Sequence, residues 1–134
     1  MAEAAVTPAI LLKSLRDDSG KIGGALAAIA LMDAAHITCA ANDFGYNAIF
    51  SRSVEALGKK GDVLIALSTS GNSVNVREAI IKAKEIDMST VALLGRDGGV
   101  TKGLSDYEIL VVGQFSDRIQ EVHMFILHII DRTC

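Results

Sequence analysis

Apolar runs of strand length alternate with helical spacings along the second half of the chain. Residues 62–67 (DVLIAL) form a continuous apolar run, the pattern of a parallel strand that is covered on both faces. Residues 90–94 and 107–112 are two further short apolar runs, while residues 76–83 and 117–132 place apolar side chains at helical spacing. This order of strand, helix, strand, loop, strand and helix predicts an α/β fold with a doubly wound parallel sheet flanked by helices.

The first half of the chain has a weaker pattern. The first 20 residues place apolar side chains on one side of a helix that would stop at Ser19-Gly20, so we expect an N-terminal helix there. Residues 26–31 (LAAIAL) are typical of a buried strand, and residues 48–57 predict a helix that ends before Gly58.

The junction before LAAIAL is too short for a parallel crossover. If Lys21-Ile22 began a strand parallel to residues 26–31, only a few residues would connect the two, whereas parallel neighbours need a connection of roughly a dozen residues or more. Either the first element is not a strand, or a segment near Gly23-Gly24, at residues 23–25, is missing from this sequence.

Length and composition indicate one cytoplasmic domain over residues 1–134. Half of the 134 residues are apolar, enough for a core. A net charge of −3 gives no electrostatic reason to expect nucleic acid or an anionic membrane as a partner. Cys39 and Cys134 match no metal or redox spacing, which favours a reducing compartment. The sequence contains neither a run of about 18 apolar residues that could span a bilayer nor a signal peptide.

Four hydroxyl side chains follow the first strong strand directly. Ser68, Thr69, Ser70 and Ser73 surround Gly71 in the stretch STSGNS, which leads into a helix. Ligands of open α/β sheets bind outside the carboxyl ends of the strands, and the free N–H groups of a helix N-terminus suit a phosphate. The competing interpretation is an ordinary helix cap. The residues alone leave both interpretations open.

Longer stretches of the chain resemble a known family. Residues 61–99 look like the core of a sugar isomerase (SIS) domain, in which the STSGNS loop holds a sugar phosphate. Residues 36–73 (HITCAANDFGYNAIFSRSVEALGKKGDVLIALSTSGNS) and 117–130 (DRIQEVHMFILHII) strongly resemble the phosphoheptose isomerase family. The resemblance covers about residues 25–134.

The resemblance implies a set of site residues. Matching hydroxyls at Ser68, Thr69, Ser70 and Ser73 bind phosphate in the family. It places Asn42 and Asp43 at the sugar. On the last helix it implies that Asp117 and Gln120 reach the substrate, that His128 is catalytic, and that Gln120 and His128 bind zinc.

The implied reaction is an aldose–ketose isomerisation through an enediol. It would convert sedoheptulose 7-phosphate into D-glycero-D-manno-heptose 7-phosphate for heptose and lipopolysaccharide biosynthesis. Such a reaction needs a base, an acid and a group that stabilises an oxyanion. His128 suits a proton-transfer role because an unperturbed histidine titrates near neutrality, and zinc would polarise the carbonyl. Gln120 and His128 are eight residues apart, about 12 Å along a helix, so binding one ion from both would stretch their side chains or require help from another subunit, and the resemblance implies sites at subunit interfaces.

The sequence departs from the family upstream of residue 25. The family has a first strand that ends in a CGNGGS-like loop, followed by a helix with a His and a Glu four residues apart, which supply zinc ligands and the main catalytic carboxylate. This sequence contains neither, and a chain that truly lacked them should have lost the activity. The alternative function is therefore a non-catalytic SIS protein that binds a replication-initiation partner or senses a sugar phosphate.

The last helix predicts an oligomer, since its apolar positions extend beyond one stripe. We expect a homotetramer with the N-terminal helix in the subunit bundle and with active sites at subunit interfaces. The expected core stripe of the last helix comprises Ile119, Val122, Phe125, Ile126 and Ile129. Of the remaining polar residues, we expect His123 on the helix surface or at an interface, His36 in a loop, Glu121 as a solvated charge and Asp97 in a turn.

Overall fold

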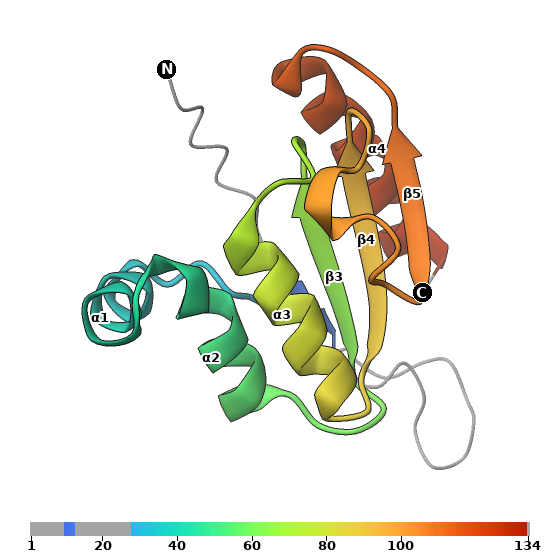
Figure 1. Cartoon of the computed structure of the whole chain (residues 1–134). Helices are drawn as coiled ribbons and strands as arrows, with labels where there is room; N and C mark the ends of the chain where they lie inside the picture. The colour runs from blue at the N-terminus through green and yellow to red at the C-terminus, as the bar shows by residue number, and fades with distance from the viewer. Residues whose placement is uncertain (1–9, 13–27, 134) are drawn as a thin grey trace, which may run out of the picture.

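A five-stranded sheet with helices on both faces makes up the described part of the protein (Figure 1). The structure, a computed structural model, describes residues 10–12 and 28–133. β3, β4 and β5 run parallel, and helices lie on both faces, which confirms the predicted doubly wound α/β fold. The strands, in their order across the sheet, are β2 (Ala28–Ala30), β1 (Ile10–Leu12), β3 (Val63–Ser68), β4 (Ser89–Gly95) and β5 (Tyr107–Val111).

The three parallel strands are the three apolar runs of the second half of the chain. Val63 lies opposite Ser89, and Ser68 lies opposite Leu94. The ends of β4 and β5, Gly95 and Val111, are paired in the same way. The carboxyl ends of all three strands therefore meet at one edge of the sheet, which is where ligands bind in this class of fold.

β1 corrects the expected N-terminal helix. Ile10–Leu12 is a strand that runs antiparallel to both β2 and β3. A short apolar segment can form either a helix or a strand. Here it pairs as a strand with the edge of β3, whose backbone N–H and C=O groups would lose these partners if the segment were helical. The other residues of the predicted helix, the Lys21-Ile22 element and the start of LAAIAL lie outside the described residues.

Four α-helices flank the described sheet. α2 and α3 lie on one face, α4 lies on the other, and α1 packs against α2 (Figure 1). None of the helices in the described residues is long and apolar enough to cross a membrane. The helices are α1 (Ala34–Phe44), α2 (Ile49–Leu57), α3 (Val74–Glu85) and α4 (Ser116–Thr133), and two 3₁₀ helices, η1 (Tyr46–Ala48) and η2 (Gly99–Thr101), lie between them.

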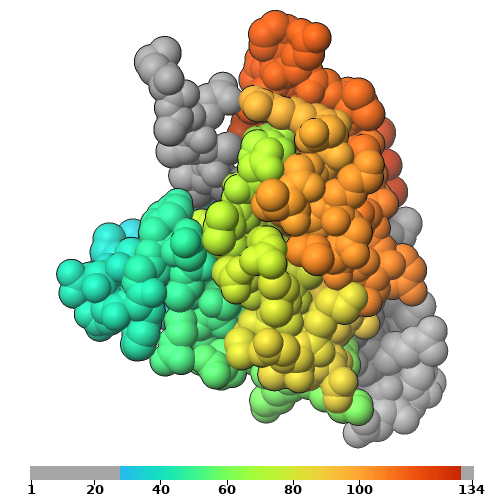
Figure 2. All heavy atoms as spheres, viewed as in Figure 1, coloured from blue at the N-terminus to red at the C-terminus, as the bar shows by residue number. Residues whose placement is uncertain are grey.

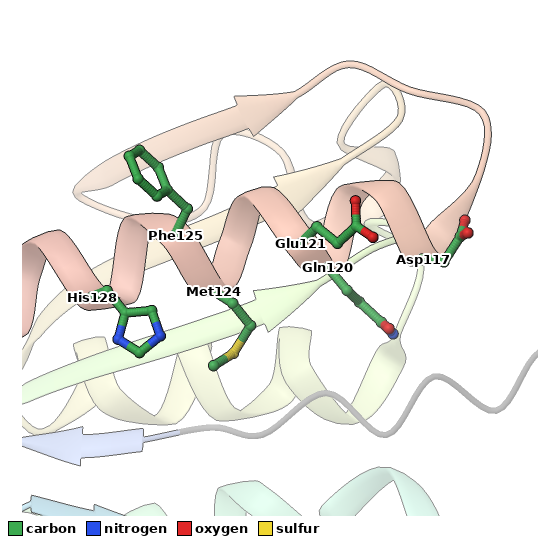
Figure 3. A pocket seen from close by; sticks show the side chains of 6 residues that line it. All are labelled: Asp117, Gln120, Glu121, Met124, Phe125 and His128. Carbon is green, nitrogen blue, oxygen red and sulfur yellow. The ribbon is translucent and has the colours of Figure 1, made fainter.

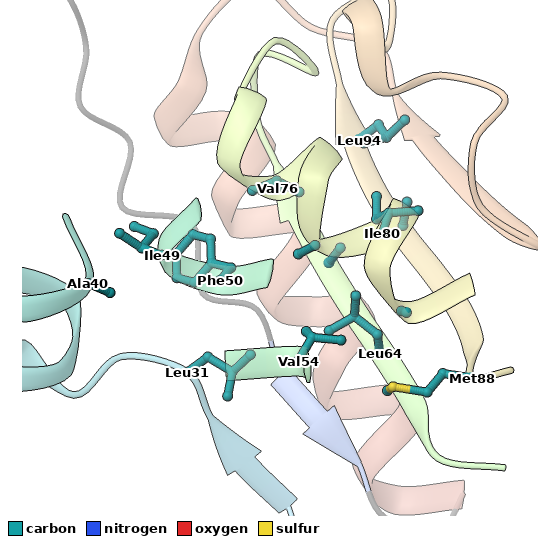
Figure 4. Close-up of a cluster of buried hydrophobic side chains, with 14 residues drawn as sticks. Leu31, Ala40, Ile49, Phe50, Val54, Leu64, Val76, Ile80, Met88 and Leu94 are labelled. Carbon is teal, nitrogen blue, oxygen red and sulfur yellow. The ribbon is translucent and has the colours of Figure 1, made fainter. Parts of the chain in front are cut away.

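Successive residues of β3 and β4 contribute to opposite sides of the sheet, as the period of two in a strand requires. Leu64 and Leu94 belong to the larger core cluster with α2 and α3 (Figure 4). Ile65, Leu67 and Leu93 form a second cluster against α4. Both faces of these strands are therefore buried, which explains their continuous apolar sequences.

α1 was not predicted from the sequence, and it corrects the expected position of His36. His36 lies in the first turn of this helix, where its backbone N–H donates to the side chain of Asp33 at 2.7 Å. Asp33 is thus the N-cap of α1. Ala40 is the one buried residue of this helix, and Ile37 and Ala41 pack beside it against the larger core cluster, so its apolar stripe is narrow and mostly alanine.

The buried stripe of α4 differs from the expected one. Ile119 and His123 are buried, and Ile126 and Leu127 pack against the second core cluster. The expected placement of His123 on the helix surface or at an interface is therefore wrong, because it lies four residues after Ile119 on the side that faces the sheet. Three residues of the predicted stripe are largely exposed instead: Val122 (42%), Phe125 (65%) and Ile129 (47%).

Candidate anion-binding site

The STSGNS stretch forms a tight loop between β3 and α3. The chain turns at Gly71, whose φ is 67°, in the left-handed region that favours glycine. The N–H of Gly71 donates to Ser68 Oγ at 3.1 Å, and the N–H of Asn72 donates to Ser70 Oγ at 3.1 Å. The hydroxyls of this loop thus hold its own backbone in shape.

The four hydroxyl residues are brought together, but they have unequal access to solvent. Ser68 is fully buried, and its hydroxyl also donates to Ser73 Oγ at 3.3 Å. Thr69 is buried as well, whereas Ser70 and Ser73 are half-buried. Ser68 therefore supports the loop from within, and Ser70 and Ser73 are the hydroxyls that a ligand can approach.

The start of α3 adds backbone donors to these hydroxyls. Ser73 is the N-cap residue, and its carbonyl accepts hydrogen bonds from the N–H groups of Val76 and Arg77, each at 3.1 Å. Within the described residues, the Ser73 side chain makes no capping hydrogen bond, so an ordinary cap does not account for this hydroxyl. The N–H groups of Val74 and Asn75 precede the first intrahelical bond and suit an anion.

Asp117, Gln120 and His128 all lie on α4 and border one open depression of about 590 Å³. The side chains of Gln120, Met124 and His128 project from the same side of the helix, with Met124 between the other two (Figure 3). Glu121 and Phe125 complete the lining. The predicted residues of the last helix thus share one accessible surface.

The His128 end of this surface lies at a distance, within one chain, from the STSGNS loop (residues 68–73), which we call the phosphate loop after its expected ligand. Ile119 lies against Gly95 at the carboxyl end of β4, and a Cβ on Gly95 would be 2.8 Å from its side chain. From there α4 runs back across the sheet, because Ile126 and Leu127 pack against the cluster of Ile65 and its neighbours. His128 is nine residues past Ile119, about 13 Å along the helix axis. The chain alone therefore does not bring His128 to the phosphate loop.

The described residues do not form a zinc site. They contain no group of three or more His, Cys, Asp or Glu side chains that could hold a metal ion. Gln120 and His128 are separated by about 12 Å of helix axis, and Met124 lies between them (Figure 3). Tetrahedral zinc needs three or four protein ligands within about 2.3 Å, so we derive no step through zinc.

Asn42 and Asp43 lie in the last turn of α1, where both are exposed. Asn42 Nδ2 donates to Asp43 Oδ1 at 2.9 Å, and Cys39 Sγ donates to Asp43 Oδ2 at 3.6 Å. Among the residues described here, no hydrogen bond or ion pair connects this pair to the phosphate loop or to α4. Their predicted position at the sugar stays a prediction.

Two histidines have partners that sequence reasoning missed. His123 Nε2 lies 3.3 Å from the carbonyl oxygen of Leu94, and burial lowers the pKa of this histidine, partly offset by that hydrogen bond. His36 Nε2 lies 2.7 Å from Ser53 Oγ. Both residues line a cavity of about 320 Å³ that is bordered by β2, the start of α1 and α2. The i, i+4 relation of His123 to Ile119 was the only signal that could have revealed the first; nothing in the sequence pairs His36 with Ser53.

Two smaller predictions are confirmed. Asp97 lies in a turn, where its side chain accepts a hydrogen bond from the N–H of Gly99 at 3.1 Å. Glu121 is an exposed helical charge that pairs with Arg118 at 2.9 Å.

Comparisons with known proteins agree with this fold and this loop. The chain is 57% identical over 106 residues to the phosphoheptose isomerase of Fusobacterium nucleatum, and 58% identical over 105 residues to that of Vibrio parahaemolyticus. These matches cover 79% and 78% of the chain, and 55% of each relative. The chain thus spans about half the length of the curated relatives it matches.

Solved structures agree in the same way. The structure of the phosphoheptose isomerase from Neisseria gonorrhoeae matches with a TM-score of 0.75 and 46% identity, over 78% of this chain and 60% of that one. The structure of a phosphoheptose isomerase from Francisella tularensis matches with a TM-score of 0.74 and 38% identity, over 78% of this chain and 59% of that one. A family model described as the SIS domain matches residues 22–95, which include the whole phosphate loop. The chain belongs to the SIS domain family.

Proposed function

We propose that this chain acts as a phosphoheptose isomerase. It would convert sedoheptulose 7-phosphate into D-glycero-D-manno-heptose 7-phosphate in the cytoplasm, as a step of heptose and lipopolysaccharide biosynthesis. The phosphate loop carries the proposal: two accessible hydroxyls and the first N–H groups of α3 converge at the carboxyl edge of the sheet. The SIS family model spans this loop, and relatives at 57% and 58% identity bear the name of that enzyme.

The loop suits a phosphate monoester for a physical reason. Ser70 and Ser73 can donate hydrogen bonds to phosphate oxygens, and the dipole of α3 places partial positive charge at the same point. Bonds to a charged acceptor are stronger than bonds between neutral groups. The loop therefore anchors the phosphate end of a sugar and leaves the opposite end to other groups.

Proton transfer would fall to His128. Its side chain is exposed on α4, so it is accessible to a substrate that is not bound at the same chain's loop. The proposal accordingly includes a homotetramer in which the α4 surface of one subunit faces the phosphate loop of a neighbour. The exposed apolar side chains Val122, Phe125 and Ile129 on the same helix support burial of part of this helix in such an interface.

Zinc belongs to the proposal only with ligands from outside the described residues. Gln120 and His128 are the residues of this chain that would contact it. Asp117, Asn42 and Asp43 would contact the sugar.

A second candidate function is a non-catalytic SIS protein, which would sense a sugar phosphate or bind a replication-initiation partner. One observation favours it. The described residues contain a complete phosphate loop but no assembled set of catalytic side chains, because α4 runs back across the sheet and carries His128 about 13 Å of helix axis away from the carboxyl edge.

A calorimetric titration with sedoheptulose 7-phosphate tests the shared part of both candidates. Replacing Ser70 and Ser73 together by alanine should weaken binding about 100-fold or more, since two hydrogen bonds to a charged group are lost, each with a net contribution of roughly 1.5–3 kcal/mol, and about 1.4 kcal/mol corresponds to a factor of ten. Ser51→Ala is the matched control, because Ser51 is also a half-buried serine and its hydroxyl donates to the carbonyl of Ala48 at 3.1 Å, away from the phosphate loop.

The outcomes separate the candidates. The isomerase is supported if the wild type binds the ligand and forms the product heptose phosphate, and if the double variant loses the binding. Binding without turnover at any enzyme concentration favours the sensor or partner-binding protein. A double variant that binds as tightly as the wild type refutes the assignment of the loop.

A further inference from the structure

The loop that follows β4 touches the phosphate loop backbone to backbone. A Cβ on Gly71 would lie 2.2 Å from both the carbonyl carbon and the oxygen of Gly98, and one on Gly99 would lie 2.5 Å from Asn72 Oδ1. The two loops lie side by side on the face shown in Figure 2. Their separation in sequence is about 30 residues, so this contact is a feature of the fold and not of the local chain.

Thr101 forms the main hydrogen-bonded link between the two loops. It ends the 3₁₀ helix η2 and is fully buried. Its hydroxyl donates to the carbonyl oxygen of Gly71 at 2.7 Å, and its backbone N–H donates to the same oxygen at 3.0 Å. One residue thus makes two hydrogen bonds to the turn of the phosphate loop.

These bonds determine where the next N–H points. The peptide bond after Gly71 is trans, so its carbonyl and the N–H of Asn72 point in opposite directions. Because Thr101 holds the carbonyl on the side of the second loop, the N–H of Asn72 is directed to the other side, where it donates to Ser70 Oγ. The orientation of the Ser70 hydroxyl therefore depends on Thr101 through one rigid peptide group.

The side chain of Asn72 adds a second link. Its Oδ1 accepts a hydrogen bond from the N–H of Val100 at 3.2 Å, and its Nδ2 donates to the carbonyl of Ser70 at 3.0 Å. Asn72 thus lies between the two loops and is bonded to both.

We propose that Thr101 is a positioning residue for anion binding: it orients the Gly71–Asn72 peptide so that Ser70 presents its hydroxyl to a phosphate group. Thr101 is itself buried and does not touch the ligand. This inference rests on the proposed function, because it assumes that the STSGNS loop binds the phosphate of a sugar phosphate.

Three variants test the proposal by calorimetric titration with sedoheptulose 7-phosphate and with inorganic phosphate. Thr101→Val keeps the shape of the side chain but removes the hydroxyl, and it should weaken binding of both ligands about 5- to 30-fold, the loss expected for one hydrogen bond. Thr101→Ser restores the hydroxyl and should recover affinity to within about twofold of the wild type.

Thr90→Val is the matched control. Thr90 is another fully buried threonine, and its hydroxyl makes a hydrogen bond of 2.8 Å to Asp106, away from the phosphate loop. This variant should lose stability to a similar degree and keep the wild-type affinity. The proposal would be overturned if Thr90→Val weakened ligand binding as much as Thr101→Val does, or if Thr101→Ser did not restore the affinity.

Amide hydrogen exchange separates this inference from the proposed function. In Thr101→Val the N–H groups of Gly71 and Asn72 should exchange faster than in the wild type, and Thr90→Val should leave them unchanged. If the wild-type chain binds neither ligand, the proposed function fails. Faster exchange then still supports the positioning of the loop by Thr101, whereas unchanged exchange overturns it.

Discussion

Replacing Gly71 by alanine tests whether contact between the two loops holds the phosphate loop in shape. The residue has a φ of 67°, and an added Cβ would lie 2.2 Å from two backbone atoms of Gly98 and 2.7 Å from the nitrogen of Gly99. No side-chain rotation can relieve an overlap with backbone atoms. The loops must therefore move apart.

The expected loss of stability has two parts. A left-handed conformation costs an alanine roughly 1–2 kcal/mol. Separation of the loops also breaks the two hydrogen bonds from Thr101 to the Gly71 carbonyl, at about 1 kcal/mol each. The free energy of unfolding of Gly71→Ala should thus fall by about 3–4 kcal/mol in total.

Gly61→Ala isolates the first part. Gly61 also has a positive φ, of 87°, but among the described residues no atom outside its own chain neighbours lies within 4 Å of its added Cβ. This variant should lose only about 1–2 kcal/mol. Urea unfolding at pH 7 measures both variants, and in a thermal scan the difference of about 2 kcal/mol corresponds to a gap in Tm of roughly 7 °C for a chain of this length.

A phosphate titration of the same proteins completes the test. Gly71→Ala should bind inorganic phosphate more weakly than the wild type, and Gly61→Ala should bind it equally well. Equal losses of stability in the two variants would refute the argument from loop contact. So would a Gly71→Ala protein that keeps its phosphate affinity.

Two further predictions concern the dependence of stability on pH. Burial lowers the pKa of His123 below its usual value of 6.5, so the unfolded chain takes up a proton that the folded chain resists; stability should be fully present above pH 6.5 and fall as the pH drops below it. Urea unfolding from pH 7.5 to 5.5 should show a smaller loss in His123→Gln, and parallel curves for the two proteins would contradict this. Hydrogen bonds from the Thr90 hydroxyl and N–H, with a smaller contribution from Lys84, lower the pKa of Asp106 below 3.8. The contribution of the ionised Asp106 carboxylate to the free energy of unfolding should therefore be present above pH 3.8 and be lost as the pH falls below it. The difference in stability between the wild type and Asp106→Asn should narrow from pH 6 to pH 3.

The sequence predicted the elements that are buried on a regular period. β3 and β4 are continuous apolar runs because both of their faces are covered, and α3 buries Val76, Ala79 and Ile80 at helical spacing. α1 escaped prediction because the side that it turns to the core, Ile37, Ala40 and Ala41, is mostly alanine, although Asp33 caps the helix. Small side chains at helical spacing are a weak hydrophobic signal in the sequence.

β1 and α4 show a second limit. Ile10–Leu12 could continue a helix or pair as a strand, and the choice depends on the free edge of β3, which is a tertiary feature. In α4 the predicted stripe followed the most apolar residues. The buried stripe includes a histidine instead, because His123 has a carbonyl partner on β4.

The site was predictable in its residue types but not in its arrangement. The hydroxyl cluster and the glycine of STSGNS are visible in the sequence. The internal use of Ser68 and the link from Thr101 are not, because each depends on which groups the fold brings within hydrogen-bond distance. The four similar hydroxyl residues therefore differ in their surroundings: Ser68 and Thr69 are buried, whereas Ser70 and Ser73 are accessible to a ligand.

Under the proposed function, binding and turnover would depend on different parts of this chain. The groups that suit an anion come from the β3–α3 loop and from the loop after β4, which one chain folds into a single hydrogen-bonded unit. The candidate group for proton transfer, His128, lies on a helix that leads away from that unit. Under the proposed function, one chain would be sufficient for the first task and not for the second. Affinity for a phosphate compound is therefore the property that follows most directly from the fold, and turnover would depend in addition on how α4 of one chain meets the phosphate loop of another.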